Sequence, residues 1–101
     1  MRVWMLEHLE DDLTLDALAH RARTSRRSFT RQFRAETGTS PHDWLLVQRI
    51  IRARLLLETT EESIPAIALR AGLGTDAALR HHFRRVLGVT PTAYRRTFTG
   101  L

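Results

Sequence analysis

Arginine is the residue whose chemistry and placement are most informative in this chain of 101 residues. All sixteen cationic side chains are arginine, against eleven carboxylates, which leaves a formal net charge of +5. Six arginines and no acid lie in residues 21–34, and five arginines and no acid lie in residues 80–96. A genome that favours arginine codons would also explain the number of arginines, so their placement is more informative than their number. Because guanidinium groups bind phosphate and guanine edges through paired hydrogen bonds, the blocks predict two electropositive surfaces that attract a polyanion.

The sequence gives little support to other chemistries. It has no cysteine, which excludes disulfides and cysteine-ligated zinc or iron–sulfur clusters. Its five histidines show no metal-ligand spacing, and no glycine-rich phosphate loop is present. We therefore expect no enzyme activity, no metal and no cofactor. No apolar run reaches the ~18 residues of a membrane span, and residues 1–10 do not resemble a secretory signal, so the expected location is the cytoplasm.

The two arginine blocks occur in matching halves of the chain. Nine apolar or turn positions recur at an offset of 49 or 50 residues, with one extra residue between Ala71 and Leu79. The pairs are Leu15 with Ile64, Leu18 with Ile67, Ala19 with Ala68, Ala22 with Ala71, Phe29 with Leu79, Phe33 with Phe83, Gly38 with Gly88, Pro41 with Pro91, and Trp44 with Tyr94. The chain therefore reads as a doubled unit.

Each unit predicts two helices joined by a short turn. The i, i+3, i+4, i+7 spacing from Leu15 and from Ile64 marks the buried face of a first helix, and an apolar pair at i, i+4 anchors the second. Closely spaced alanines permit the steep helix crossing of a helix-turn-helix. The predicted N-caps are Thr14, Thr24 or Ser25, Ser40, Ser63, Thr75 or Asp76, and Thr90. Gly38 and Gly88 are predicted to end the second helices, and the apolar residues before Leu13 predict an additional first helix.

The second helix of each unit, about residues 26–37 and 76–87, is predicted to present a polar outer face. An α-helix fits the major groove of B-form DNA, where arginine pairs with guanine and aspartate accepts from cytosine. The residues turned outward are Arg26, Arg27, Thr30, Arg31 and Arg34 in the first unit, and Asp76, Ala77, Arg80, His81 and Arg84 in the second. Predicted phosphate contacts are Ser25, Arg34, Thr75, Arg84 and Arg85. His82 is expected to be a helix-surface residue.

A long helix from Pro41 to about Leu57 is predicted between the units. Two apolar stripes on opposite sides would pack against one lobe each. The first stripe is Trp44, Val47, Ile51 and Leu55, and the second is Leu46, Ile50, Ala53 and Leu57. About seventeen residues span ~25 Å, so the two outward helices are expected near ~34 Å apart, one turn of a DNA duplex.

This pattern resembles the DNA-binding domain of the AraC/XylS family over about residues 10–98. The second half carries the more specific signature: Ile64-x-x-Ile67-Ala68-x-x-x-Ala71-Gly72-Leu73, then Leu79-x-x-x-Phe83-Arg84, then Gly88-x-x-Pro91-x-x-Tyr94-Arg95. The first half matches at Leu18-Ala19, Ser25, Phe29, Arg31, Phe33, Gly38, Pro41, Trp44-Leu45, Arg49 and Ala53. Two positions depart mildly from the family, since Leu73 stands where phenylalanine is usual and Trp44 where tyrosine is common.

The resemblance implies an all-α fold of about seven helices, with two homeodomain-like helix-turn-helix subdomains, residues 1–40 and 59–101, joined by a linker helix, residues 41–58. It implies a bacterial transcription regulator that places both second helices in successive major grooves of operator DNA, with RNA polymerase as a further candidate partner. Many family members carry an effector-binding or dimerising domain ahead of this one, so the chain is expected to be either a stand-alone regulator or part of a longer protein with such an N-terminal domain. The base-facing residues carried over by position are Arg26, Arg27, Thr30, Arg31, Asp76, Ala77, Arg80 and His81. The alternative is a helical protein-interaction module that does not bind DNA.

Overall fold

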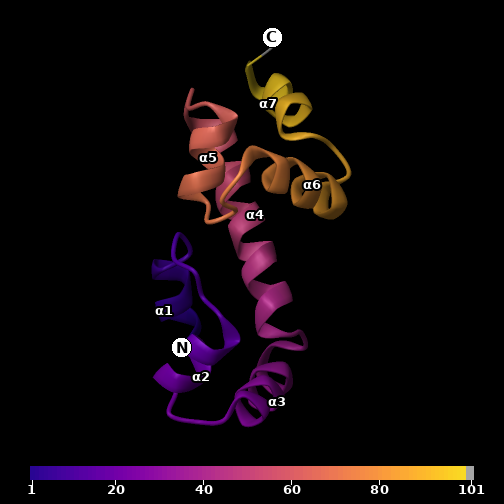
Figure 1. The fold of residues 1–101 in the computed structure, drawn as a ribbon. Helices are drawn as coiled ribbons and strands as arrows, with labels where there is room; N and C mark the ends of the chain where they lie inside the picture. Colours follow the sequence, from indigo (N-terminus) through magenta and orange to yellow (C-terminus); the bar gives the residue numbers. More distant parts are fainter. Residues whose placement is uncertain (100–101) are drawn as a thin grey trace.

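The computed structural model describes residues 1–99, and every regular element within that range is an α-helix (Figure 1). The seven helices are α1 (Arg2–Glu7), α2 (Leu15–Arg21), α3 (Arg26–Thr37), α4 (Pro41–Thr59), α5 (Ile64–Arg70), α6 (Asp76–Leu87) and α7 (Pro91–Thr99). The predicted all-α fold with about seven helices is therefore confirmed. The proposed second subdomain, 59–101, extends two residues beyond the described part of the chain.

The helices form two lobes at the two ends of α4, which runs through the middle of the molecule (Figure 1). Lobe 1 contains α1, α2 and α3, and lobe 2 contains α5, α6 and α7. The described chain is elongated, with principal extents of 49 × 22 × 21 Å. This shape places α3 and α6 far apart along the long axis while α4 joins them.

Each lobe has its own apolar core, and α4 contributes side chains to both. The lobe 1 core consists of Met5, Leu9, Leu18, Ala19, Phe29, Phe33 and Leu45. The lobe 2 core consists of Ile50, Ala53, Leu56, Leu57, Ile67, Ala68, Ala71, Leu79 and Phe83. The two lobes are the two copies of the doubled unit, because four of the repeated pairs are buried at equivalent places of the two cores: Leu18 with Ile67, Ala19 with Ala68, Phe29 with Leu79, and Phe33 with Phe83.

Side-chain caps begin the helices where the sequence predicts them. The hydroxyls of Thr14, Ser25, Ser40, Ser63 and Thr75 each accept a hydrogen bond from the backbone N–H three residues later, at 3.1–3.2 Å. Such a cap satisfies a donor that the first helical turn cannot pair internally. Ser25 and Thr75 are thereby identified as the caps of α3 and α6, the two helices with polar outer faces.

The prediction of two buried stripes on the linker helix is wrong for one stripe. Val47, Ile51 and Leu55 are 41%, 44% and 57% exposed, so they form an apolar strip on the solvent side of α4. The helix instead packs on lobe 1 through Leu45 near its start and on lobe 2 through its second half. A nineteen-residue helix meets the two lobes one after the other along its length, so burial on two full-length opposite sides is not needed.

Ala22 and Ala71 occupy matched positions of the repeat but differ in burial. Ala71 at the end of α5 is fully buried, whereas its counterpart Ala22 at the end of α2 is exposed. The turn after α5 is therefore covered by other parts of the molecule and the turn after α2 is not.

None of the described helices combines the length and the apolar character that a membrane crossing demands.

Candidate nucleic-acid interface

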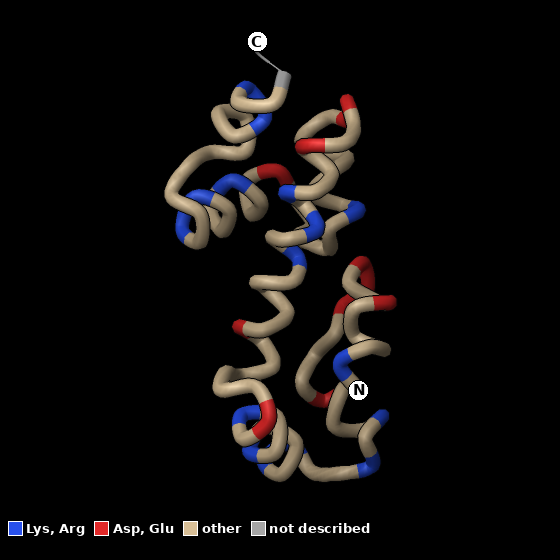
Figure 2. The backbone as a smooth tube through the Cα atoms, turned by 180° about the vertical axis from the view of Figure 1, so that it is seen from behind, with Lys and Arg blue, Asp and Glu red and all other residues tan. Residues whose placement is uncertain are grey.

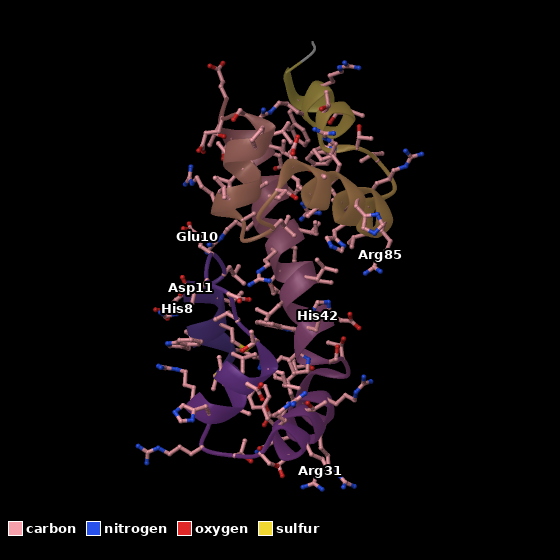
Figure 3. All side chains as sticks on the ribbon, in the orientation of Figure 1. His8, Glu10, Asp11, Arg31, His42 and Arg85 are labelled. Atoms are coloured by element: carbon pink, nitrogen blue, oxygen red, sulfur yellow. The ribbon has the colours of Figure 1, made fainter. Side chains whose placement is uncertain are left out.

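The cationic helices α3 and α6 lie at different heights along α4. Figure 1 shows α6 beside the upper half of α4, on the side opposite α5, and α3 beneath the lower end of α4, and Figure 2 shows blue arginine positions along both helices from behind. In Figure 3, Arg85 on α6 lies to the right of α4, and Arg31 on α3 lies at the bottom of the molecule. One partner that meets both helices would have to extend along the length of α4.

On α3, the predicted contact residues form an open cationic surface. Arg26, Arg27, Arg31 and Arg34 are exposed, and Thr30 is half-buried beside them. They line a shallow hollow together with Leu15 of α2. Arg26 pairs with Asp16 of α2, with 3.3 Å between Nε and Oδ1. Because both side chains of this pair are exposed, it is a weak interaction that a phosphate or a base edge can replace.

On α6, two of the predicted contact residues, Asp76 and Arg80, form an ion pair with each other. Ala77 and His81 are exposed, and Arg84 and Arg85 follow them toward the end of the helix. The Asp76 carboxylate accepts a hydrogen bond from Arg80 one turn later. Asp76 and Arg80 therefore neutralise each other in the free protein, which gives α6 a less positive start than α3.

An aromatic pair supports each of these helices from beneath. Phe33 of α3 meets Trp44 of α4 edge to face, with ring centroids 5.7 Å apart, and Phe83 of α6 meets Tyr94 of α7 in the same way at 5.6 Å. The four residues occupy matched positions of the repeat. Trp44 and Tyr94 each pack against the core of their own lobe.

Two arginines of the predicted basic blocks do not belong to this surface. The guanidinium of Arg21 lies over the Trp4 ring of α1, 4.0 Å from its centroid, which is a cation–π contact. Arg95 is half-buried and donates to the carbonyl oxygens of Leu57, Thr60 and Glu62 at 3.4, 3.2 and 2.7 Å. Arg95 therefore holds the end of α4 to α7. This role could not be predicted from the sequence, because a charge pattern does not reveal carbonyl partners.

His82 is a residue that the sequence placed wrongly on the helix surface. Its side chain is half-buried, and its Nδ1 is buried with no hydrogen-bond partner among the described residues. The rings of His81 and His82 meet edge to face at 5.0 Å. Burial lowers the pKa of His82, and the charges of His81, Arg85 and His42 lower it further. His42 belongs to α4, so this cluster lies where α6 faces the linker helix (Figure 3).

The lowered pKa of His82 predicts a pH-dependent stability. The unfolded chain takes up a proton on this residue near pH ~6.5, before the folded protein does, so the contribution of neutral His82 is present above that pH and is lost as the pH falls. In His82→Gln, the decrease in Tm between pH 7.5 and pH 5.5 should be smaller than in the wild type. The exposed His20 provides the control, since His20→Gln should leave the wild-type pH dependence unchanged. An equal decrease in His82→Gln and wild type would contradict the assignment.

Sequence comparisons relate the chain to named regulators. A family model described as a helix-turn-helix domain matches residues 18–97. An HTH-type transcriptional regulator of Mycobacterium tuberculosis is 42% identical over 81 residues, which make up 80% of this chain and 31% of the relative. The HTH-type transcriptional activator RhaS of Escherichia coli is 32% identical over 93 residues, which make up 92% of this chain and 34% of RhaS. The chain thus spans about a third of the length of these relatives.

Solved structures give the same relationship. The DNA-binding domain of AdpA, described as a global transcriptional factor in complex with a target DNA, is similar with a TM-score of 0.93 and 46% identity, covering 97% of this chain and 88% of that one. The C-terminal domain of AraT, a response regulator from Geobacillus stearothermophilus, has a TM-score of 0.91 and 34% identity, covering 95% and 80%. The similarity therefore extends over both lobes and α4.

Proposed function

Because the chain belongs to the AraC/XylS-type family of helix-turn-helix transcription regulators, we propose that it binds double-stranded DNA sequence-specifically through α3 and α6. In this proposal, residues 1–40 and 59–101 are two DNA-binding subdomains and residues 41–58 are the linker between them. The chain would be the DNA-binding part of a bacterial regulator.

The observation that carries the proposal is the pair of equivalent cationic helices, one in each lobe, at opposite ends of α4 (Figure 2). The nineteen residues of α4 span about 28 Å, and the molecule is 49 Å long. A separation near one duplex turn, ~34 Å, fits within this length. Both helices would then enter successive major grooves on one face of the duplex, with bending of the DNA where the match is imperfect.

The proposed roles divide the exposed residues into two groups. Residues at the start of each helix face base edges, where hydrogen bonds report sequence, and residues near the caps and the helix ends face phosphates, which fix position. The proposed base contacts are Arg26, Arg27, Thr30, Arg31, Asp76, Ala77, Arg80 and His81. The proposed phosphate contacts are Ser25, Arg34, Thr75, Arg84 and Arg85.

The wider setting follows from the same proposal. A regulator that binds chromosomal DNA acts in the cytoplasm, at the nucleoid, and needs no catalytic step of its own. RNA polymerase is the further partner we propose, because RhaS is named as a transcriptional activator. The names of the relatives, all regulators, support a binding role in preference to an enzymatic one.

A protein-interaction module is the second candidate function. The exposed apolar strip of Val47, Ile51 and Leu55 on α4 is the observation that favours it. Such a module would associate through apolar burial, which salt does not weaken. If the affinity for duplex DNA does not change with salt concentration, the protein does not bind through phosphates, which would favour this candidate over the DNA-binding one.

Arg31→Ala tests the assignment of base contacts. Arg31 is exposed near the middle of α3, and its loss should weaken binding to a duplex selected from a random pool by about 1–3 kcal/mol and relax the preference at one base position. Fluorescence anisotropy with the selected duplex and its single-base-pair variants measures both effects. Arg2→Ala makes the same charge change on α1, away from the proposed surface, and should leave affinity nearly unchanged. If selected and random duplexes lose affinity equally in Arg31→Ala, the residue contacts only phosphate.

A further inference from the structure

The two helix-turn-helix turns share one backbone conformation. In the turn after α2, the N–H of Arg23 donates to the His20 carbonyl and that of Thr24 donates to the Ala19 carbonyl, at 3.0 and 3.1 Å. In the turn after α5, Gly72 and Leu73 donate to Leu69 and Ala68 in the same pattern, at 3.1 and 2.8 Å. Arg23 and Gly72 are therefore equivalent positions, 49 residues apart.

Backbone conformation alone does not explain the glycine at residue 72. Both positions lie in the left-handed region, with φ of 56° at Arg23 and 83° at Gly72, and lobe 1 accommodates a large side chain there. A Cβ atom on Gly72 would lie 1.8 Å from the carbonyl oxygen of Leu9 and 2.9 Å from Nε of Arg49. Since Leu9 belongs to lobe 1, the two lobes touch at Gly72 with no room for a side chain.

Arg49 of α4 completes this contact. Its Nε donates to the Leu9 carbonyl at 3.0 Å, and one of its terminal nitrogens donates to the Asp11 carbonyl at 2.9 Å. One turn later, Arg52 donates to the Leu6 carbonyl at 3.1 Å. Burial lowers the pKa of Arg49, while the Asp12 carboxylate acts in the opposite direction. Two arginines of the linker helix thus hold the chain segment that presses on lobe 2.

The two turns also differ in burial, as expected if only the turn after α5 contacts the other lobe. Ala71, next to Gly72, is 0% exposed, whereas Ala22, next to Arg23, is exposed. The turn after α5 is packed against the other lobe, and the turn after α2 faces solvent. The contact is therefore a specific feature of the arrangement between lobes and is not a general property of the repeated unit.

We propose that the contact of Gly72 with Leu9 and Arg49, here called the interlobe clasp, fixes the angle between the two lobes and so sets the spacing of the DNA half-elements that α3 and α6 bind together. The inference rests on the proposed function, since it concerns how both helices engage one duplex. Gly72 and Arg49 act in it as positioning residues that do not contact DNA.

Half-element spacing is sensitive to this angle because DNA is helical. A turn contains about 10–10.5 base pairs, so one added base pair rotates the second half-element by about a tenth of a turn and moves it along the axis. If the angle between the lobes is fixed, binding both displaced half-elements requires distortion of the protein or of the DNA. A protein with loosened lobes follows the displacement at the cost of ordering the lobes on binding.

The first experiment measures lobe orientation without DNA. The chain has no cysteine, so spin labels attach only at introduced sites such as Ala35→Cys on α3 and Ala93→Cys on α7, both exposed. Pulsed electron paramagnetic resonance should give a narrow distance distribution in the otherwise wild-type chain and a broadened or shifted one with Gly72→Ala. Gly74→Ala is the matched control, because Gly74 has the same φ of 83° but open space where its Cβ would lie.

The second experiment measures spacing preference on DNA. We expect the wild type and Gly74→Ala to bind the selected spacing on the order of tenfold more tightly than a duplex with one inserted base pair, because insertion displaces one half-element from its helix. In Gly72→Ala this preference should fall below about threefold, a difference of under ~0.7 kcal/mol. Arg49→Met tests the clasp without changing the backbone, and the exposed Arg54→Met is its control. If Gly72→Ala does not fold, the Arg49→Met variant still tests the spacing preference.

The outcomes separate the clasp from the proposed function. Clasp variants that keep the narrow distance distribution and the full spacing preference would overturn the inference while leaving DNA binding intact. A wild-type chain that binds no two-element duplex would overturn the proposed function, and the distance distributions would still report whether the clasp orients the lobes.

Discussion

Phe83→Ala is expected to lower the free energy of unfolding by about 3–5 kcal/mol, because truncation of a buried phenylalanine removes apolar burial and leaves a cavity. Phe83 is completely buried in the lobe 2 core and packs edge to face on Tyr94. Its counterpart Phe33 is 4% exposed in the lobe 1 core and meets Trp44, so Phe33→Ala should have an effect of similar size. Urea unfolding followed by circular dichroism measures both values.

Phe98 provides a matched control for these substitutions. It is 48% exposed on α7, so Phe98→Ala makes the same chemical change at a half-exposed position and should cost less. An unchanged Tm in Phe83→Ala would mean that the side chain does not face the core. The assignment of the outer face of α6 depends on that orientation and would then also be wrong.

DNA affinity is expected to fall steeply with salt, with log K against log [salt] decreasing at a slope of about −3 to −6. The slope of about −3 follows from the three arginines proposed to contact phosphates, Arg34, Arg84 and Arg85, because each neutralised phosphate contributes about −0.9. The slope of about −6 applies if the arginines proposed to face bases also displace counterions. Between about 50 and 200 mM salt, affinity should therefore fall by about 60- to 4,000-fold.

Single substitutions give this prediction a quantitative check. Arg34→Ala should reduce the magnitude of the slope by about one unit and weaken binding to all duplexes alike. Arg2→Ala again supplies the control, since Arg2 is an exposed arginine of α1 outside the proposed contact residues. A slope near zero would contradict a phosphate-binding surface and would favour association through the apolar strip of α4.

The features that the sequence predicts well are those set by local chemistry. The bounds of α3 and α6 agree with the predicted 26–37 and 76–87, because a hydroxyl cap, an apolar pair four residues apart and a terminal glycine all lie within one short segment. The cores follow from the repeat for the same reason. The outward position of the cationic side chains could be predicted because the buried pair fixes the opposite face.

The features that it misses depend on contacts between distant segments. Val47, Ile51 and Leu55 have helical apolar spacing, yet that spacing does not show which lobe, if any, covers them. Arg49 and Arg95 look like surface charges, but both bind backbone carbonyls more than thirty residues away in sequence. A carbonyl is present at every residue, so sequence patterns carry no signal for such partners. The base contacts remain proposals, because side-chain types alone do not establish which groove atom each residue reaches.

Hydroxyl-radical footprinting on a duplex selected from a random pool shows whether α3 and α6 bind one duplex at the same time. Two protected tracts are expected on the same face of the DNA, with centres about 10–10.5 base pairs apart. Substitutions on α3 should remove one tract and substitutions on α6 the other. A single tract that is insensitive to substitutions on either helix would mean that the two helices do not bind the duplex together.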